Sequence, residues 1–209
     1  AESVCMSEIV HGQPNMYFLF MAMAVKMLRT NGEFVFITPR SWTSGTYFKS
    51  FRSYFMDSMD IQRVHLFESR NSVFKGKEGH SDDILQETMI TYGKKSKSQS
   101  RNIIIAISQN AQDLGKVKEI QVESGNCLPE GKEHYFVLPS DEEDLKVLNY
   151  MKKMPNTVEE AGFRFKTGQV VEFRNKEYIA WEKKESTIPL LHSCNVLEGR
   201  IVFPAQTEK

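Results

Sequence analysis

Two groups of side chains in this 209-residue sequence are suited to chemistry or to binding. The first lies in residues 75–83, where His80, Asp82 and Asp83 could bind a metal or exchange protons. Glycines and a serine surround them, which favours a solvated loop, and we predict no metal site. The second group is basic and can contact phosphate. It comprises Lys94, Lys95, Lys97 and Arg101, then Arg164, Lys166, Thr167, Arg174 and Lys176.

The charge balance describes an average and does not exclude a nucleic-acid partner. Lys and Arg total 27, as do Asp and Glu, so the net charge is zero. Basic residues gather at 94–101 and 164–176, whereas residues 141–144 are acidic. For the first basic stretch, charged residues on solvated turns are an equally good interpretation. A composition of 40% hydrophobic and 26% charged residues is typical of a globular protein and excludes a low-complexity chain.

The cysteines and the apolar runs indicate the compartment. The 3 cysteines are far apart and form neither a metal-ligand pair nor a disulfide framework, which favours a reducing cytoplasm. The most apolar run, residues 16–25, is shorter than the roughly 20 residues of a membrane helix. No signal peptide is recognisable. We therefore predict a soluble, cytoplasmic protein without a membrane partner.

The elements that must position these residues alternate between helix and strand. Residues 15–30 are predicted to form a helix that Asn31 and Gly32 end, and its apolar surface predicts burial on more than one side. The run 34–37 is typical of a central parallel strand covered on both faces. A helix over 47–56, capped by Thr43 or Ser44, should place its aromatic residues on one face, with Lys49 and Arg52 opposite.

Strands are expected at 61–67 and 84–92, which completes the pattern of a doubly wound α/β sheet. Such a sheet needs more strands than these, and the sequence contains neither GxGxxG nor GxxxxGK[ST]. We therefore expect the chain to be a fragment that lacks the nucleotide-binding half of its sheet.

The serine- and lysine-rich stretch 94–101 predicts a surface linker, and we place a domain boundary between residues 95 and 96. Beyond it, strands are expected at 102–107, 116–122 and 134–138, and a β-rich stretch at 163–181. Ser140 should cap a helix over 141–154 that turns four apolar residues inward: Leu145, Val147, Leu148 and Met151.

Several segments, in order, resemble the motifs of gamma-class DNA adenine-N6 methyltransferases, in particular the type IIG-like methylases of restriction–modification systems. They are residues 15–20 (NMYFLF), 32–42 (GEFVFITPRSW), 47–52 (YFKSFR), 72–74 (SVF), 84–90 (ILQETMI), 165–174 (FKTGQVVEFR), 188–191 (IPLL) and 199–201 (GRI). The pair ITPRSW and YFK..R is the most specific. The resemblance covers nearly the whole chain.

The resemblance implies an α/β fold: an incomplete Rossmann-like S-adenosylmethionine-dependent methyltransferase sheet, followed by a mixed α+β region. Residues 1–95 would be the C-terminal half of the catalytic domain. Residues 96–209 would connect it to, and begin, the target-recognition domain. The intact enzyme would transfer a methyl group from S-adenosyl-L-methionine to adenine N6 of double-stranded DNA. The cofactor loop and the catalytic Asn-Pro-Pro-Tyr of the family are not found, so the fragment holds no catalytic residue and should be inactive alone.

The resemblance also assigns roles to residues. Phe74 would stack on the flipped target adenine, although a Val-Phe pair can also be ordinary core. Asn15 and Phe20 would approach the cofactor, although an aromatic residue in an apolar helix is more often core. Arg40 follows Pro39 at the carboxyl edge of its strand, where open α/β sheets bind ligands, although Pro39 can simply end the strand.

DNA contact is assigned to Arg40, Lys166, Thr167 and Arg174. A restriction endonuclease, as a domain or a subunit, is the further partner that the resemblance implies. The alternative function is a non-catalytic DNA-recognition or interaction module on a methyltransferase-like scaffold. A methyltransferase acting on RNA or protein is a third reading, which the TPRSW and KTGQVVEFR segments disfavour through resemblance.

Overall fold

The computed structural model describes residues 9, 15–69, 86–113, 115, 117–166, 168 and 170–204. The chain divides into two compact units, residues 1–155 and 156–209, and each is described by itself. The first unit combines helices with a five-stranded mixed sheet. The prediction of an α/β fold is therefore confirmed at this level.

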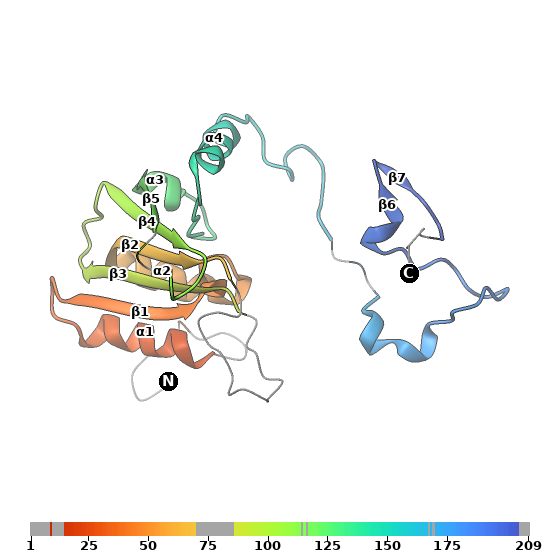
Figure 1. Ribbon diagram of the computed structural model, residues 1–209, viewed down its shortest axis with the longest axis horizontal. Helices are drawn as coiled ribbons and strands as arrows, with labels where there is room; N and C mark the ends of the chain where they lie inside the picture. The colour runs from red at the N-terminus through yellow and green to blue at the C-terminus, as the bar shows by residue number, and fades with distance from the viewer. Residues whose placement is uncertain are drawn as a thin grey trace. The chain divides into compact units, whose positions relative to one another are not determined.

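The sheet of the first unit has the strand order β1-β3-β2-β4-β5 (Figure 1). Neighbouring strands are antiparallel except β2 and β4, which are parallel. A bulge between Ile61 and Arg63 in β2 explains why the buried residues Ile61 and Val64 are three positions apart. The strands are β1 (Glu33–Pro39), β2 (Met59–Phe67), β3 (Thr88–Lys95), β4 (Asn102–Ser108) and β5 (Lys118–Glu123).

The position of β1 differs from the prediction. We expected a central parallel strand covered on both faces, but β1 lies at the edge of the sheet and pairs antiparallel with β3. Val35 is 65% exposed and Ile37 49% exposed, while the alternate residues Phe34 and Thr38 are buried. A continuous apolar run cannot reveal how many neighbours a strand has, because the run looks the same when one face is uncovered.

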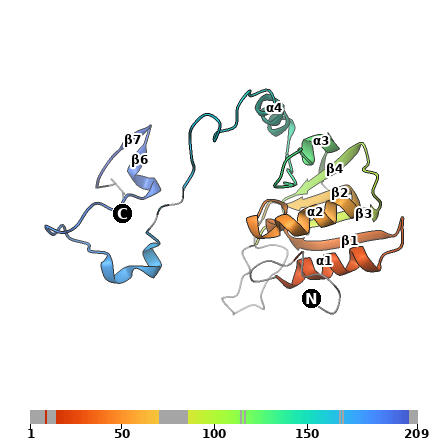
Figure 2. The ribbon, with the colours of Figure 1, turned by 180° about the vertical axis from the view of Figure 1, so that it is seen from behind.

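Helix α1 (Met16–Met27) forms where it was predicted, and Asn31 after it takes a positive φ of 62°. It runs alongside β1, and α2 (Lys49–Ser58) lies behind the sheet in Figure 1 and in front of it in Figure 2. The predicted burial of α1 on more than one side is wrong, since Met16, Phe20 and Met27 are exposed. Only the stripe Phe18, Met21, Ala22 and Val25 is buried.

Aromatic residues build the core between α2 and the segment that follows β1. That segment contains two short 3-10 helices, η2 (Arg40–Thr43) and η3 (Thr46–Phe48). Trp42, Phe51 and Phe55 are fully buried, with ring centroids 5.5 to 5.9 Å apart. The predicted aromatic face of α2 is confirmed for Phe51 and Phe55. The predicted cap is wrong, because the residue before α2 is Phe48, which makes no side-chain cap hydrogen bond.

The segment from β5 to Pro155 contains α3 (Ser124–Cys127) and α4 (Glu142–Met151). Asp141 caps α4 by accepting a hydrogen bond from the Asp144 main-chain N–H, so the prediction of Ser140 as the cap is corrected. No residue of α4 is buried. The expected inward burial is therefore wrong for Val147 and Met151, each 56% exposed, whereas Leu145 is partly buried and packs against the core.

Residues 134–138, expected as a strand, belong to no sheet, and His134 takes a positive φ of 50°. Their main chain instead bonds to two separate segments: Phe136 N donates to Thr43 O at 2.9 Å and Val137 N to Cys127 O at 2.7 Å. Because those acceptors lie on different elements, the segment crosses between them and forms no ladder.

The second unit has little regular structure among its described residues. It contains η4 (Glu172–Arg174), η5 (Lys176–Tyr178), η6 (Ser193–Asn195), β6 (Val196–Leu197) and β7 (Arg200–Ile201). The predicted β-rich stretch at 163–181 is wrong for the residues described there. Phe165 and Trp181 are 89% and 94% exposed, and a strand of such residues gains stability only when a neighbouring surface covers them.

The stretch 94–101, where we expected a boundary, connects β3 to β4 within the sheet. The two compact units meet between residues 155 and 156. The predicted boundary between functional domains at 95/96 is a separate matter and stays a prediction. In the part of the chain that the structure describes, no helix has the length and apolar character needed to cross a membrane.

Candidate functional site

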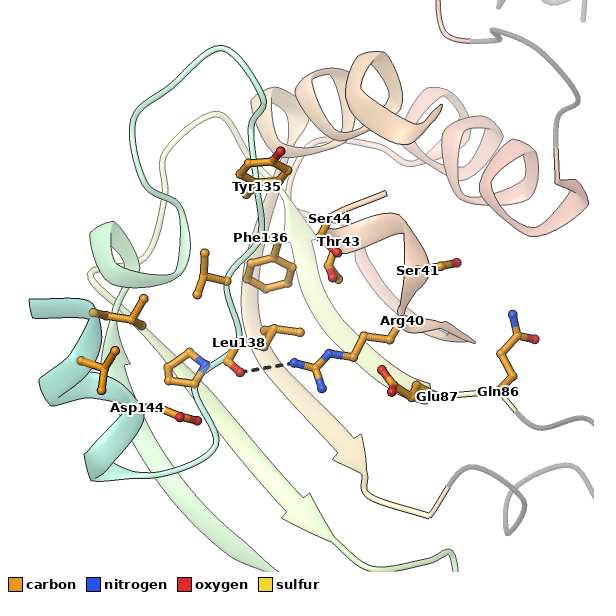
Figure 3. Close-up of a pocket in the computed structure, with 14 residues that line it drawn as sticks. Arg40, Ser41, Thr43, Ser44, Gln86, Glu87, Tyr135, Phe136, Leu138 and Asp144 are labelled. Atoms are coloured by element: carbon orange, nitrogen blue, oxygen red, sulfur yellow. Dashed lines mark hydrogen bonds between the residues drawn. The ribbon is translucent and has the colours of Figure 1, made fainter. Parts of the chain in front are cut away.

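A pocket of about 870 Å³ opens at the carboxyl end of β1 (Figure 3). Three stretches of chain and one helix form it: residues 40–44 after β1, Gln86 and Glu87 before β3, residues 135–139, and α4 through Asp144, Val147 and Leu148. All of them belong to the first unit. Arg40, where the sequence predicts a carboxyl-edge site, lines this pocket, and its ligand-binding role stays a prediction.

Arg40 is the one cation among the described residues that line the pocket. Its main-chain N–H donates to Glu87 O at 2.8 Å, which ties the end of β1 to the start of β3. Its guanidinium reaches across to Leu138 O at a long 3.5 Å (Figure 3). A guanidinium has five N–H donors, so this single long contact leaves donors for a ligand.

Two carboxylates, those of Glu87 and Asp144, line the same pocket. The Ser140 hydroxyl donates to Asp144 Oδ2 at 2.6 Å and the Ser140 N–H at 2.7 Å. These hydrogen bonds, helped by the charge of Arg40, hold the pKa of Asp144 below its ordinary value. The pocket therefore combines a guanidinium, two carboxyl groups and an apolar wall. It can bind a ligand that presents both donors and acceptors beside an apolar or anionic group.

Ser41 and Trp42, which follow Arg40, are held by hydrogen bonds to α1 and to β1. The Tyr17 hydroxyl of α1 lies 3.0 Å from Ser41 Oγ, and Trp42 Nε1 donates to Thr38 Oγ1 at 3.2 Å. Burial raises the pKa of Tyr17 to about 12, against the opposing effect of the Ser41 hydrogen bond. The phenol is protonated at neutral pH and serves as a structural tie between α1 and η2.

The structure does not bring all of the predicted site residues together. Phe74, the loop 75–83 and Thr167 lie outside the described residues. Asn15, directly before α1, is exposed, and its side chain makes no cap hydrogen bond. Phe20 is 61% exposed on α1. Neither Asn15 nor Phe20 lines the pocket at Arg40.

The other predicted DNA-contact residues lie in the second unit. Lys166 and Arg174 are exposed there, and the Arg174 guanidinium lies 5.4 Å from the ring centroid of Phe173. In the first basic stretch, Lys94 pairs with Glu33 at 3.3 Å and Lys95 donates to Leu28 O at 2.7 Å. These contacts favour a structural role for Lys94 and Lys95, whereas Lys97 and Arg101 of the same stretch are exposed.

Sequence reasoning missed the wall of the pocket formed by residues 135–139 and by Asp144. Their contacts with residues 40–45 join positions that are nearly a hundred residues apart, as in the contact from Arg40 to Leu138. The only local signal was an apolar run ending at Pro139, which suggested an extended segment without indicating its neighbours.

Part of the chain around this pocket matches a known protein family. Residues 6–74, which include β1 and Arg40, match the Eco57I restriction-modification methylase family. The predicted resemblance to restriction–modification methylases is therefore confirmed.

Two relatives extend the similarity along the chain. The chain is 30% identical over 196 residues to the type II methyltransferase M.PstI of Providencia stuartii, and 30% identical over 199 residues to M.BsuBI of Bacillus subtilis. In each case the alignment covers 93% of this chain and 38% of the relative, so the chain spans well under half the length of these enzymes.

Among solved structures, the M protein of the type I restriction enzyme EcoKI is similar to this chain. The match covers 81% of this chain and 48% of the M protein. The sequence identity is 8% and the TM-score 0.43.

Proposed function

We propose that this chain is part of a site-specific DNA methyltransferase that transfers a methyl group from S-adenosylmethionine to adenine N6 in a restriction–modification system. The observation that carries the proposal is the similarity to two type II methyltransferases over 93% of the chain. The position of β1 also supports it. Among the described residues β1 is an edge strand, so a larger sheet could continue there, and the exposed Val35 and Ile37 leave an apolar face that another element could cover.

In such an enzyme the cofactor supplies the reactive methyl group, and the protein orients the target base. An adenine inside a duplex must leave the base stack before its exocyclic nitrogen can react. We assign contact with the flipped base to Phe74. Asn15 and Phe20 would hold part of the cofactor, since the exposed ring offers a stacking face and the Asn15 amide can hydrogen-bond. Neither carries the charge needed to bind the cofactor's carboxylate, so we expect weak binding by this chain alone.

DNA contact is proposed for Arg40, Lys166, Thr167 and Arg174. Arg40 lines the pocket, and its guanidinium has N–H donors beyond the one that contacts Leu138 O. Lys166 and Arg174 are exposed. Phosphate contacts of this kind fix the register of a protein on DNA without reading its sequence. A restriction–modification role further implies a cytoplasmic enzyme that acts with a restriction endonuclease, as a domain or a subunit.

A second candidate function is a DNA-recognition or interaction module without catalysis. It is favoured by the second unit, where exposed aromatic residues alternate with basic ones, as in Phe165, Lys166, Phe173 and Arg174. Aromatic and basic side chains together are suited to nucleic-acid surfaces.

The two candidates separate in one experiment. The 209-residue chain is incubated with duplex DNA and radiolabelled S-adenosylmethionine, and both DNA binding and methyl incorporation are measured. We expect salt-sensitive duplex binding, weak cofactor binding and no methyl incorporation. Methylation by this chain alone would contradict the proposal that it is catalytically incomplete. Tight binding to one DNA sequence with no affinity for the cofactor would favour the second candidate.

A further inference from the structure

Arg52 is a buried cation that bonds to main-chain carbonyls from two distant segments. It was predicted opposite the aromatic face of α2, but its exposed fraction is 0%. Its guanidinium donates to Trp42 O at 3.0 Å and Gly45 O at 2.6 Å, both in the turn after β1. It also donates to Glu133 O at 2.8 Å and His134 O at 3.0 Å.

Further contacts hold the same two segments together. One of these segments, residues 133–139, forms a strap. Lys49, one helical turn before Arg52, bonds to the Glu133 carboxylate at 2.6 Å. The ring of Phe136 lies 5.7 Å from that of Trp42, and the Arg52 guanidinium lies 5.3 Å from the ring of Tyr135. Arg52 is the only one of these residues that bonds to both segments through its side chain.

Stability alone is a poor explanation for this arrangement. A buried charge must give up its hydration, and well-packed apolar residues of similar volume often stabilise a protein as well or better. Burial lowers the pKa of Arg52, and the nearby Tyr135 and Glu133 act in the opposite direction. A guanidinium differs from these alternatives because its N–H donors point in fixed directions. Its planar fork can hold several carbonyl oxygens in fixed positions, which neither an apolar side chain nor a lysine can do.

The held segments are two walls of the pocket. Residues 40–44 carry Arg40 on one side, and residues 135–139 of the strap form the other. The contact from Arg40 to Leu138 O spans the gap between them. We infer that Arg52 is a positioning residue, which sets the distance between Arg40 and the strap and so keeps the pocket in the form that receives DNA. The part of this inference that concerns DNA rests on the proposed function.

The test compares Arg52→Lys with a matched variant, Arg63→Lys, in the 209-residue chain. Arg63 lies on β2 and pairs with Glu119 at 2.6 Å, away from the strap. Hydrogen exchange at the amides of Phe136 and Val137 reports whether the strap stays closed, because these amides bond to Thr43 O and Cys127 O. Amides in β2 and β4 report on the sheet, and duplex affinity is measured at several salt concentrations.

For Arg52→Lys we expect exchange at Phe136 and Val137 to become about tenfold faster or more, as when hydrogen bonds to a charged group are lost. The sheet amides should be unchanged. Duplex affinity should fall while its dependence on salt is kept, because Arg40 remains to neutralise phosphate. Arg63→Lys should change none of these quantities. Unchanged strap exchange in Arg52→Lys, or a loosened strap with full duplex affinity, would overturn the positioning role.

A second variant covers the case in which Arg52→Lys also loosens the sheet. In Arg52→Ala, added ethylguanidinium should restore protection of the strap amides, whereas ethylammonium should not. Equal rescue by both compounds would show that any cation suffices and would overturn the inference.

Failure of the proposed function gives a different pattern. If the unmodified chain binds no duplex at low salt, the DNA role of the pocket is wrong. Strap exchange and guanidinium rescue then still decide whether Arg52 sets the pocket wall.

Discussion

The two units of this chain are organised by different forces. The first is built on an apolar core in which Trp42, Phe51 and Phe55 are fully buried. In the described part of the second unit, only Asn195 is buried. Its side chain closes a loop by accepting from His192 N at 2.8 Å and donating to Val202 O at 2.9 Å. Burial of apolar surface is the main source of stability, so the first unit should be stable alone while the second should gain stability from a partner.

The exposed residues of the second unit indicate what a partner would cover. Large apolar side chains there include Phe163, Phe165, Phe173, Tyr178, Trp181 and Ile188. Exposed apolar residues in such number are typical of interaction surfaces. Under the proposed function, DNA or the remainder of a larger enzyme would cover them.

The largest expected effect contrasts one phenylalanine from each unit. Phe51→Ala should lower the free energy of unfolding of the first unit by about 3–5 kcal/mol, because it leaves a cavity in the core. Phe173 is 69% exposed, so Phe173→Ala should change that free energy by no more than about 0.5 kcal/mol. Denaturant titration followed by tryptophan fluorescence measures both. Equal effects would remove the contrast between the units.

An intermediate effect is expected at α4, the last helix of the first unit. Asp141→Ala removes the cap bond to the Asp144 N–H and should destabilise α4 by about 1 kcal/mol. Hydrogen exchange of the α4 amides measures this change. Asn149→Gln, at an exposed position in the same helix, is the control and should leave exchange unchanged. If Asp141→Ala behaved like this control, packing and not the cap would hold the helix.

The smallest effect is a pH dependence at the same helix. The pKa of Asp144 is lowered, first by the Ser140 hydroxyl. Its contribution to stability is therefore fully present above the ordinary carboxyl pKa of about 3.9 and is lost as pH falls through the lower folded value. The protection factors of the α4 amides, which compare exchange with the intrinsic rate at each pH, should fall in that acid range. Ser140→Ala removes the hydroxyl donor and should move the loss to higher pH, and an identical acid profile would exclude this cause.

The sequence predicted most of the elements of the first unit because their patterns are local. Helix α1, the aromatic face of α2, and the strands near 61–67 and 102–107 follow from residues within one element. The edge position of β1 does not, because strand order depends on partners far away in the chain. Nor does the burial of Arg52, since arginine opposite an aromatic face normally remains in solvent, and its carbonyl partners lie some eighty residues away.

The candidate site was predictable in part for the same reason. Pro39 and Arg40 at the end of an apolar run indicated a carboxyl-edge ligand position, and a pocket opens there. Its opposite wall comes from residues 135–139, which carry no motif of their own. The roles of Phe74 and Thr167 stay predictions, since both lie outside the described residues.

The most direct test of the central claim, that Arg40 in this pocket contacts DNA, is the salt dependence of duplex binding. Affinity of the 209-residue chain and of Arg40→Gln is measured across a range of salt concentrations. Loss of one phosphate contact should reduce the slope of log affinity against log salt concentration by about 0.9. Strap exchange should be unchanged, because Arg52 still holds the pocket wall. An identical slope for the two proteins would contradict the account and place the DNA elsewhere on the molecule.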